Sequence, residues 1–217
     1  MRSVFSAIGV AVIFVLIGCY TFGGVAGSGV AKSESRDVTD FTAIHFSGVG
    51  KVVIEQTGQE SLSITADDNL LPLLESKVSD GTLHLRVKED NSISPKTPIE
   101  FKVGVKDLSK VSLSGAGDVE IKQLKTEKLA VTISGVGNAK ASGSADKLEV
   151  TVSGTGNFDG EKLQAKHATV HCSGVGNAVV NAAKSLDANV SGVGSVEYLG
   201  KPKVKQSVSG IGSVKKR

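Results

Sequence analysis

The chain has 217 residues, of which 40% are hydrophobic, 4% are aromatic and 22% are charged, and its formal net charge is +3. Lys and Arg are spread along the chain between Asp and Glu, and no basic stripe with interleaved aromatic residues occurs, which argues against a nucleic-acid surface. Of the 26 glycines, 14 stand in one repeated phrase, so they indicate a regular bend rather than disorder.

The first residues are typical of a bacterial export signal. Arg2 supplies one positive charge, and residues 4–17 form an uncharged, largely apolar run that ends in Leu16-Ile17-Gly18-Cys19. This ending resembles the bacterial lipobox. The resemblance implies a signal peptide over residues 1–18, cleavage before Cys19 and lipidation of Cys19.

Two alternatives to this lipoprotein signal remain open. Cleavage after the small residues 24–26 would give a soluble secreted or periplasmic form. The uncharged stretch also continues to Ala31, so an uncleaved membrane anchor is a third reading. All three place the rest of the chain outside the cytoplasm, in the bacterial cell envelope or beyond it.

The segment that follows is expected to begin irregularly. Residues 19–40 are small and polar without a periodic pattern, which predicts a flexible tether. Residues 41–110 contain short alternating strands separated by glycine turns, with an Asp80-Gly81 turn and a polar loop over residues 89–98.

One phrase, Ser-Gly-x-Gly, organises the chain and occurs seven times. From the second copy onward the serines are 20, 19, 20, 18 and 18 residues apart, which indicates a stacked repeat. An alternating apolar strand precedes each of these copies, and a polar residue with a second short strand follows it. The serines of the phrase are Ser47, Ser114, Ser134, Ser153, Ser173, Ser191 and Ser209.

This pattern predicts an all-β protein built as a single-stranded parallel β-helix, a solenoid with about 18–20 residues per turn. The domain is expected over residues 41–214, with less regular turns over 41–110 and strict repeats over 111–214. Each turn should hold three short strands around a narrow shaft of Val, Leu and Ile side chains. Large aromatic side chains are not expected to fit that shaft.

The glycines of the phrase are expected to form corners, because glycine adopts positive φ without a Cβ clash. The predicted structural corners are Gly48, Gly50, Gly115, Gly117, Gly135, Gly137, Gly154, Gly156, Gly174, Gly176, Gly192, Gly194, Gly210 and Gly212. The polar residue after each corner should stack from turn to turn and hydrogen-bond along a ladder. The predicted ladder is Asp118, Asn138, Asn157, Asn177, Ser195 and Ser213.

No pattern in the sequence favours a catalytic, cofactor-binding or metal site. The phrase lacks the third glycine and the following helix of a dinucleotide loop, and it lacks the regular Asp of calcium-binding repeats. His167 and His171 lie four residues apart on one strand, about 13 Å, which is too far to chelate one metal. We therefore expect no cofactor, no metal site and no catalytic residue. Cys172 is expected to point into the core, and His167 and His171 are expected to lie on a solvated strand face; the other two histidines are His45 and His84.

The repeated phrase followed by Asn resembles the family called "putative autotransporter adhesin head GIN domain", over residues 41–214. Further likenesses are Phe41-x-x-Ile44, the segment Asp80-Gly81-Thr82-Leu83, Leu108-Ser109-Lys110-Val111, and the late Tyr198-Leu199-Gly200-Lys201-Pro202. The resemblance implies a right-handed parallel β-helix, export or a lipoprotein anchor, and a surface or adhesive role. Because the chain stops at Lys215-Lys216-Arg217, an outer-membrane barrel after the repeats is not expected.

The expected function is that of a non-enzymatic cell-envelope module, adhesin-like or structural, attached to a membrane through its lipid anchor or N-terminal helix. The alternative is a β-helix that binds or degrades polysaccharide. An envelope polysaccharide or a protein is the expected kind of partner, and nucleic acid is not. The binding function is expected on outward strand faces, through Lys140, Lys147, Glu149, Thr151, Lys166 and Thr169.

Overall fold

The structure is a computed structural model that describes residues 24–217. The signal peptide expected over residues 1–18 and the lipidation expected at Cys19 lie outside the described residues.

The described chain consists almost entirely of strands. The first group is β1 (Val25–Ala26), β2 (Ala31–Arg36), β3 (Ala43–Phe46), β4 (Val49–Gln56), β5 (Ser61–Asp67), the 3-10 helix η1 (Leu71–Leu73), β6 (Leu74–Ser79), β7 (Thr82–Val87), β8 (Ile93–Ser94) and β9 (Glu100–Val105). The second group is β10 (Lys110–Leu113), β11 (Ala116–Ile133), β12 (Val136–Val152), β13 (Thr155–Cys172), β14 (Ala178–Val190), β15 (Val193–Gly200), β16 (Lys203–Val208) and β17 (Ile211–Lys216).

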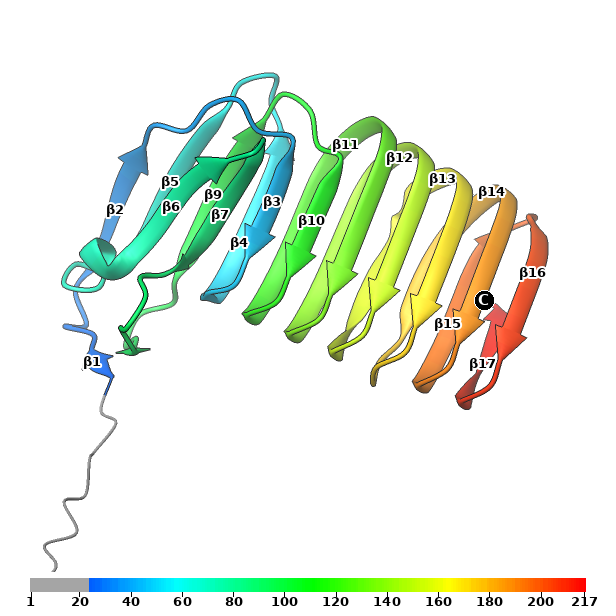
Figure 1. Ribbon diagram of the computed structural model, residues 1–217. Coiled ribbons are helices and arrows are strands. Elements are labelled where there is room, and N and C mark those ends of the chain that lie inside the picture. The colour runs from blue at the N-terminus through cyan, green and yellow to red at the C-terminus, as the bar shows by residue number, and fades with distance from the viewer. Residues whose placement is uncertain (1–23) are drawn as a thin grey trace, which may run out of the picture.

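The second group winds into a parallel β-solenoid of about five turns, which confirms the predicted fold class (Figure 1). Each of β11, β12 and β13 covers most of one turn, and successive turns pair in parallel register, so that Val131 lies between Val111 and Val150. A turn has two long sides and a short third segment, in which Leu124 pairs with Gly143.

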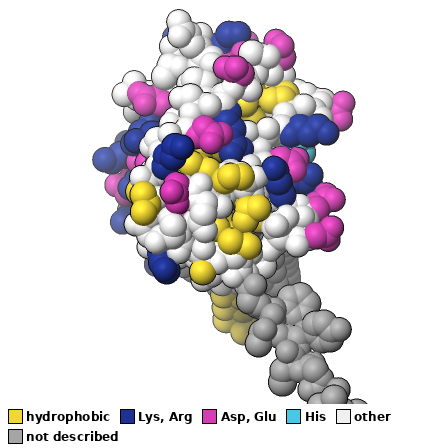
Figure 2. Space-filling model, turned by 90° about the vertical axis from the view of Figure 1, so that its left-hand side faces the viewer, with side chains coloured by type: hydrophobic (Ala, Val, Ile, Leu, Met, Phe, Trp, Pro, Cys, Tyr) yellow, Lys and Arg dark blue, Asp and Glu magenta, His cyan; other side chains and the backbone are white. Residues whose placement is uncertain are grey.

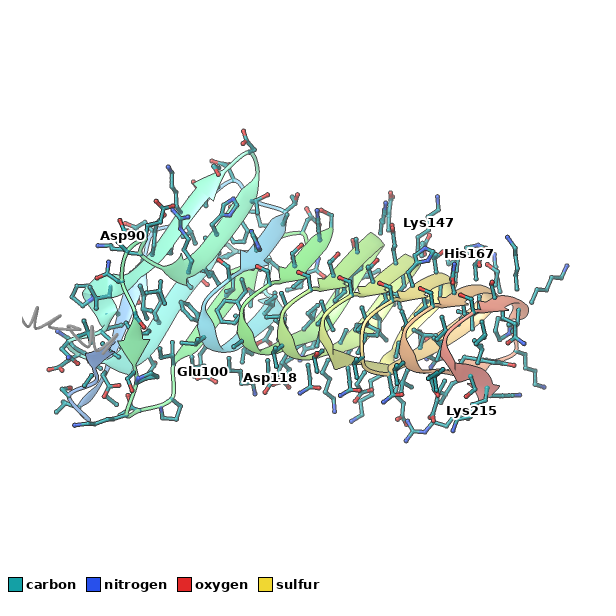
Figure 3. All side chains as sticks on the ribbon, turned by 60° about the horizontal axis from the view of Figure 1, so that its bottom comes forward. Asp90, Glu100, Asp118, Lys147, His167 and Lys215 are labelled. Atoms are coloured by element: carbon teal, nitrogen blue, oxygen red, sulfur yellow. The ribbon has the colours of Figure 1, made fainter. Side chains whose placement is uncertain are left out.

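The two long sides form two faces of the molecule. Face A contains β6, β7, β3, β10, the C-terminal halves of β11 to β14, and β16. Face B contains β2, β5, β9, β4, the N-terminal halves of β11 to β14, then β15 and β17. Figure 3 shows the consequence for side chains: Asp118 and Lys215 project from one side of the coil, whereas Lys147 and His167 project from the other.

The N-terminal third differs from the expected succession of irregular turns. Strands β3 and β4 stack directly on β10 and β11, with Val49 beside Ala116, although 67 residues separate Ser47 from Ser114. Residues 57–109 are therefore an excursion, and they fold onto the outer side of this first turn. Three of the pairings there are antiparallel, namely β6 with β7, β5 with β9, and β2 with β5. The excursion closes one end of the solenoid (Figures 1 and 2). We call residues 57–109, together with β1 and β2, the cap.

The tether expected over residues 19–40 is not what the described part of that segment forms. Strand β1 pairs with β8, and β2 pairs with β5 over six residues as the outermost strand of face B. The Arg36 guanidinium then donates hydrogen bonds to the carbonyl oxygens of Leu74 and Leu71, at 2.6 and 2.8 Å. Because these carbonyls precede and begin β6, Arg36 joins the edges of the two faces across the cap.

Asp67 is the buried charge of the cap and is fully shielded from solvent. Its carboxylate accepts backbone N–H bonds from Gly29, Lys96 and Thr97, at 2.7, 2.9 and 3.1 Å. Burial raises the pKa of Asp67, but these hydrogen bonds from Thr97, Gly29 and Lys96 outweigh it and hold the pKa below its usual value. One side chain therefore fastens the start of the described chain and the loop before β9 to the end of β5.

Within the strict repeats the interior is a column of aliphatic side chains, with one aromatic exception that the sequence did not predict. Phe158 is buried within the strict repeats, where large aromatic rings were not expected to fit. Its neighbours in the adjoining turns are Ala139 and Ala178, which leave the volume that the ring occupies. The ring also covers Gly160, where a Cβ atom would collide with it. Cys172 is buried as predicted, and burial raises the pKa of its thiol to about 11.

The corner glycines serve close approach more than positive φ. Gly137 has a φ of 145°, but Gly135, the first glycine of the same phrase, is not in the positive region. At both positions a Cβ atom would collide with the carbonyl oxygen of the equivalent glycine one turn earlier, Gly115 for Gly135 and Gly117 for Gly137. The turns stack too closely at this corner for any side chain to point along the axis.

We predict that Gly137→Ala destabilises the protein by at least about 3 kcal/mol, because it adds backbone strain to a collision with backbone that cannot retreat. Gly58→Ala is the matched control: Gly58 also has positive φ, at 80°, but a Cβ atom there meets open space. That variant should lose only about 1 kcal/mol. Urea unfolding measures both, and equal losses would show that stacking distance is not the constraint.

We predict that Asp67 makes the stability depend on acid pH. A carboxyl whose pKa is lowered by folding contributes stability that is complete above its unfolded pKa, near 4, and that is lost as the pH falls through the folded value. Asp67→Asn should therefore unfold more easily at pH 7 and show a flatter decline between about pH 4 and pH 2. Asp187→Asn, at an exposed carboxylate, should keep the wild-type profile. An Asp67→Asn profile parallel to that of the wild type would contradict the prediction.

Candidate ligand groove

The polar residues after the corners form a hydrogen-bonded column on face B. The Asp118 carboxylate accepts bonds from both the backbone N–H and the side-chain amide of Asn138, each at 3.0 Å. Asn157 donates to Asn138 at 2.9 Å, and Asn177 donates twice to Asn157. The column continues with the Ser195 N–H bound to Asn177 and the Ser195 hydroxyl 3.2 Å from that of Ser213. The polar groups of this column hydrogen-bond to one another along the solenoid axis, so we assign the column a structural role.

Many of the charged side chains of the strict repeats are likewise paired. The Nζ atom of Lys140, a residue expected to carry function, lies 3.3 Å from Oδ2 of Asp159. The Nζ atom of Lys166 lies 2.7 Å from Oδ1 of Asp146. Such exposed pairs contribute at most about 1 kcal/mol each. The other expected residues lie apart from Lys140, on face A: they are Lys147, Glu149, Thr151 and Thr169. The structure therefore places these four residues on neighbouring strands of face A and leaves Lys140 on the opposite face.

A groove of about 750 Å³ lies instead on face B beside the cap, over β2, β5, β9 and β4. It forms where the regular column of the solenoid gives way to antiparallel strands. Ser35 and Ser63 are opposite each other in the register of β2 and β5, and Ser61 lies opposite Gly104. Since Gly104 has no side chain, the Ser61 and Thr57 hydroxyl groups occupy the space beside it.

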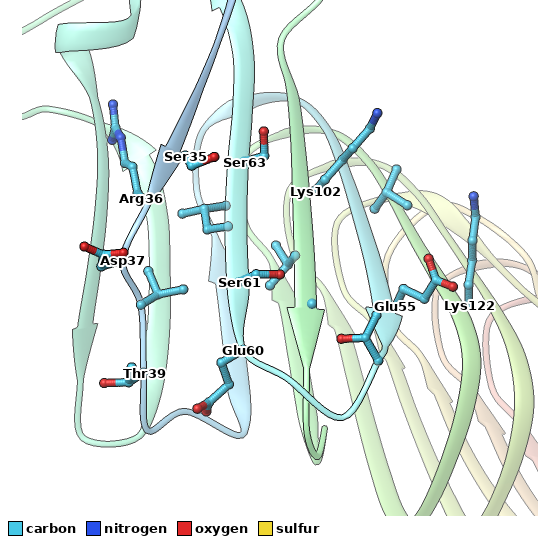
Figure 4. A pocket seen from close by; sticks show the side chains of 16 residues that line it. Ser35, Arg36, Asp37, Thr39, Glu55, Glu60, Ser61, Ser63, Lys102 and Lys122 are labelled. Atoms are coloured by element: carbon cyan, nitrogen blue, oxygen red, sulfur yellow. The ribbon is translucent and has the colours of Figure 1, made fainter.

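The lining combines hydroxyl, carboxylate and ammonium groups. Figure 4 shows Ser61 and Ser63 on the central strand, between Asp37 and Thr39 on one side and Lys102 on the other. The remaining polar lining residues are Ser35, Arg36, Glu55, Thr57, Glu60 and Lys122, and the apolar ones are Val38, Val53, Leu62 and Val103. The groove thus offers hydrogen-bond donors and acceptors together with an apolar floor, on strands that cannot move independently.

Glu60 lies at one end of the groove and is held firmly. Its carboxylate accepts a hydrogen bond from Lys106 at 2.8 Å and another from the Phe41 N–H at 3.1 Å. The Lys106 ammonium, followed by the backbone N–H of Phe41, lowers the pKa of Glu60. The carboxyl is therefore ionised at neutral pH, and it cannot serve as the protonated acid that glycoside cleavage requires.

His167 and His171 are exposed on the outward side of face A, as the sequence predicts, whereas the juxtaposition of His45 and His84 was not predicted. His167 bonds to Ser185 at 2.7 Å, and His171 lies between Thr151 and Asn189. His45 and His84, which are 39 residues apart in the sequence, lie side by side on neighbouring strands of face A. A shared sequence pattern foreshadows this, since both stand between buried apolar residues, in Ile44-His45-Phe46 and Leu83-His84-Leu85.

Two absences apply to residues 24–217. No cluster there places three or more His, Cys, Asp or Glu side chains around a common point for a metal ion. None of the helical segments in that range has the length and apolar character needed to cross a membrane.

Solved structures of bacterial proteins share this architecture. A "putative adhesin" from Bacteroides fragilis NCTC 9343 is 28% identical, with a TM-score of 0.75 over 89% of this chain and 100% of that one. A "putative lipid binding protein" from Parabacteroides distasonis ATCC 8503 is 25% identical, with a TM-score of 0.58 over 89% of this chain and 99% of that one. A "putative adhesin" from Parabacteroides merdae ATCC 43184, 21% identical over 89% of this chain and 98% of that one, shares the fold with a TM-score of 0.55.

Comparison with curated proteins gives no match. The model of one protein family, however, matches residues 40–202, which cover most of the chain and include residues 57–109 and most of the strict repeats. The chain belongs to the family described as "Putative auto-transporter adhesin, head GIN domain".

Proposed function

We propose that this protein is a non-enzymatic, adhesin-like binding module of the bacterial cell envelope, and that the groove beside the cap holds its ligand. The observation that carries the proposal is the groove itself, of about 750 Å³, at the place where the paired columns of face B are interrupted. Membership of an adhesin family and likeness to the Bacteroides fragilis structure support a role outside the cytoplasm.

The chemistry of the lining favours a polyhydroxylated ligand such as an envelope polysaccharide. Sugars present hydroxyl groups along their edges and C–H groups on their faces. Ser35, Ser61 and Ser63 can hydrogen-bond to sugar hydroxyl groups, and Val53 on the floor of the groove can contact the C–H face of a sugar ring. The acyl chain of a lipid, which is the ligand class named for the Parabacteroides distasonis protein, would leave these hydroxyls and the charge of Asp37 without partners.

Binding is favoured over catalysis because Glu60 is committed to structural hydrogen bonds and is ionised at neutral pH. The alternative, a polysaccharide-degrading enzyme, would need a second carboxyl to act as acid. Glu55 and Asp37 are the other carboxyl groups of the lining, so they are the residues whose replacement tests this alternative.

An anchor at Cys19 would set the orientation of the module. Residues 19–23 span at most about 18 Å, and β1 and β2 are already part of the cap. The cap would then face the membrane, and the solenoid would project away from it. The groove would lie close to the membrane surface, where polysaccharide attached to the envelope is concentrated.

We predict that the purified protein binds a component of an envelope-polysaccharide array, and that Ser63→Arg weakens this binding at least about ten-fold by filling the groove. Ser63 faces solvent at the centre of the groove, so the variant should melt within about 2 °C of the wild type. Thr169→Arg makes a similar change on face A and should bind normally.

A reducing-sugar assay on each bound polysaccharide separates the two functions. If the protein releases reducing ends, and if Glu55→Gln or Asp37→Asn abolishes this release, the protein is an enzyme rather than a binding module. Binding that persists in Ser63→Arg but fails in Thr169→Arg would move the ligand site to the other face.

A further inference from the structure

Two imidazole side chains meet on the outer surface of face A, across the molecule from the groove. His45 on β3 and His84 on β7 are directly paired in parallel register. The residues before and after each of them are buried, so both imidazoles point away from the core. Their ring centroids are 5.5 Å apart, and the ring planes meet at 69°.

This separation is that of two imidazoles bound to one metal ion. Zinc binds histidine nitrogen at about 2.0–2.1 Å, and a ring centroid lies roughly 1 Å beyond the nitrogen, so tetrahedral geometry places two centroids about 5 Å apart. We propose that His45 and His84 form a binding site for a divalent transition-metal ion, with Zn²⁺ as the occupant to test first. The proposal is independent of the glycan groove.

A hydrogen bond from a third element orients one of the two rings. The Ser114 hydroxyl, at the corner between β10 and β11, lies 2.7 Å from His45 Nε2. With Nε2 engaged, Nδ1 is the nitrogen of His45 that is left for the metal. Such outer hydrogen bonds fix the tautomer of metal-binding histidines and strengthen them as ligands. Ser114 belongs to the Ser-Gly-x-Gly phrase, so the solenoid corner supplies the support.

The electrostatic surroundings set the strength of the site. The charged groups around the pair are Lys77, opposite His84 on β6, Lys110 on β10, and the ion-paired Glu75 and Arg86 in the next row. The two lysines repel a cation, which favours micromolar rather than nanomolar affinity.

Within the described residues the two imidazoles are the side chains available to a metal ion here, so a bound ion would keep coordination positions open. These positions suit water or a donor group from a second molecule. Imidazole ligands select Zn²⁺, Cu²⁺ and Ni²⁺ over Mg²⁺ and Ca²⁺, which prefer oxygen.

The test is calorimetric titration of the protein with Zn²⁺ and, separately, with Mg²⁺, at pH 7.5 and pH 5.0. We expect one Zn²⁺ per chain with micromolar affinity at pH 7.5, a loss of about ten-fold or more in His45→Ala and in His84→Ala, and no binding of Mg²⁺. At pH 5.0 protonation of the imidazoles should weaken Zn²⁺ binding in the wild type. The melting temperatures of both variants in EDTA, compared with that of the wild type, show that the fold is intact.

His171→Ala is the matched control. His171 lies in the same outward row of face A, but its neighbours on the adjoining strands are Thr151 and Asn189 rather than a second imidazole. Its removal should leave the affinity unchanged. The proposal is overturned by an absence of saturable Zn²⁺ binding, by unchanged binding in His84→Ala, or by an equal loss in His171→Ala.

Discussion

The close stacking of successive turns at the Ser-Gly-x-Gly corner is the constraint on which the rest of the structure depends. Parallel pairing sets the turns about 4.8 Å apart. At the corner this spacing places the carbonyl oxygen of one glycine where the Cβ atom of the next would stand, as between Gly117 and Gly137. Only glycine satisfies the backbone pairing of both long sides at once. The phrase therefore recurs for a steric reason, and positive φ accompanies it at only some of its glycines.

The same spacing dictates what the outer surface can carry. Residues in register stand in columns, so like charges would repel along the axis. The sequence mostly places opposite charges in neighbouring turns instead, as in Lys140 with Asp159, or amides such as Asn138 with Asn157. Lys128 and Lys147, which are register partners, are an exception. Side chains that satisfy their neighbours in this way have little left for a ligand. A binding site is therefore expected where the columns are interrupted, and the groove and the histidine pair both lie at the cap or next to it.

The repeat period predicted the solenoid because spacing and alternation are local properties of the sequence. The same reading failed over residues 57–109, because an excursion that leaves and rejoins the stack has no period to reveal it. Ser47 shows the difficulty: its phrase is one turn from that of Ser114 in space but 67 residues away in the sequence. The burial of Phe158 could not be predicted from the width of a single turn, because Ala139 and Ala178 in the adjoining turns leave the volume for its ring.

The candidate site could not be predicted for the same reason. The groove joins Ser35, Ser63 and Lys102 across β2, β5 and β9, two of whose pairings are antiparallel and fixed only by the tertiary fold. His45 and His84 carry matching local patterns, but no sequence rule states that their strands are neighbours.

The strict repeats and the excursion therefore have different roles. The repeats provide a rigid coil whose surface is committed to its own hydrogen bonds and ion pairs, and glycine at the corner permits little variation there. The excursion is under no such constraint, because its strands need only cover the open edges of β3 and β4. Changes in residues 57–109 can alter the groove without disturbing the stacking of the turns. In this architecture, specificity for a ligand is therefore expected to vary through the cap while the solenoid stays constant.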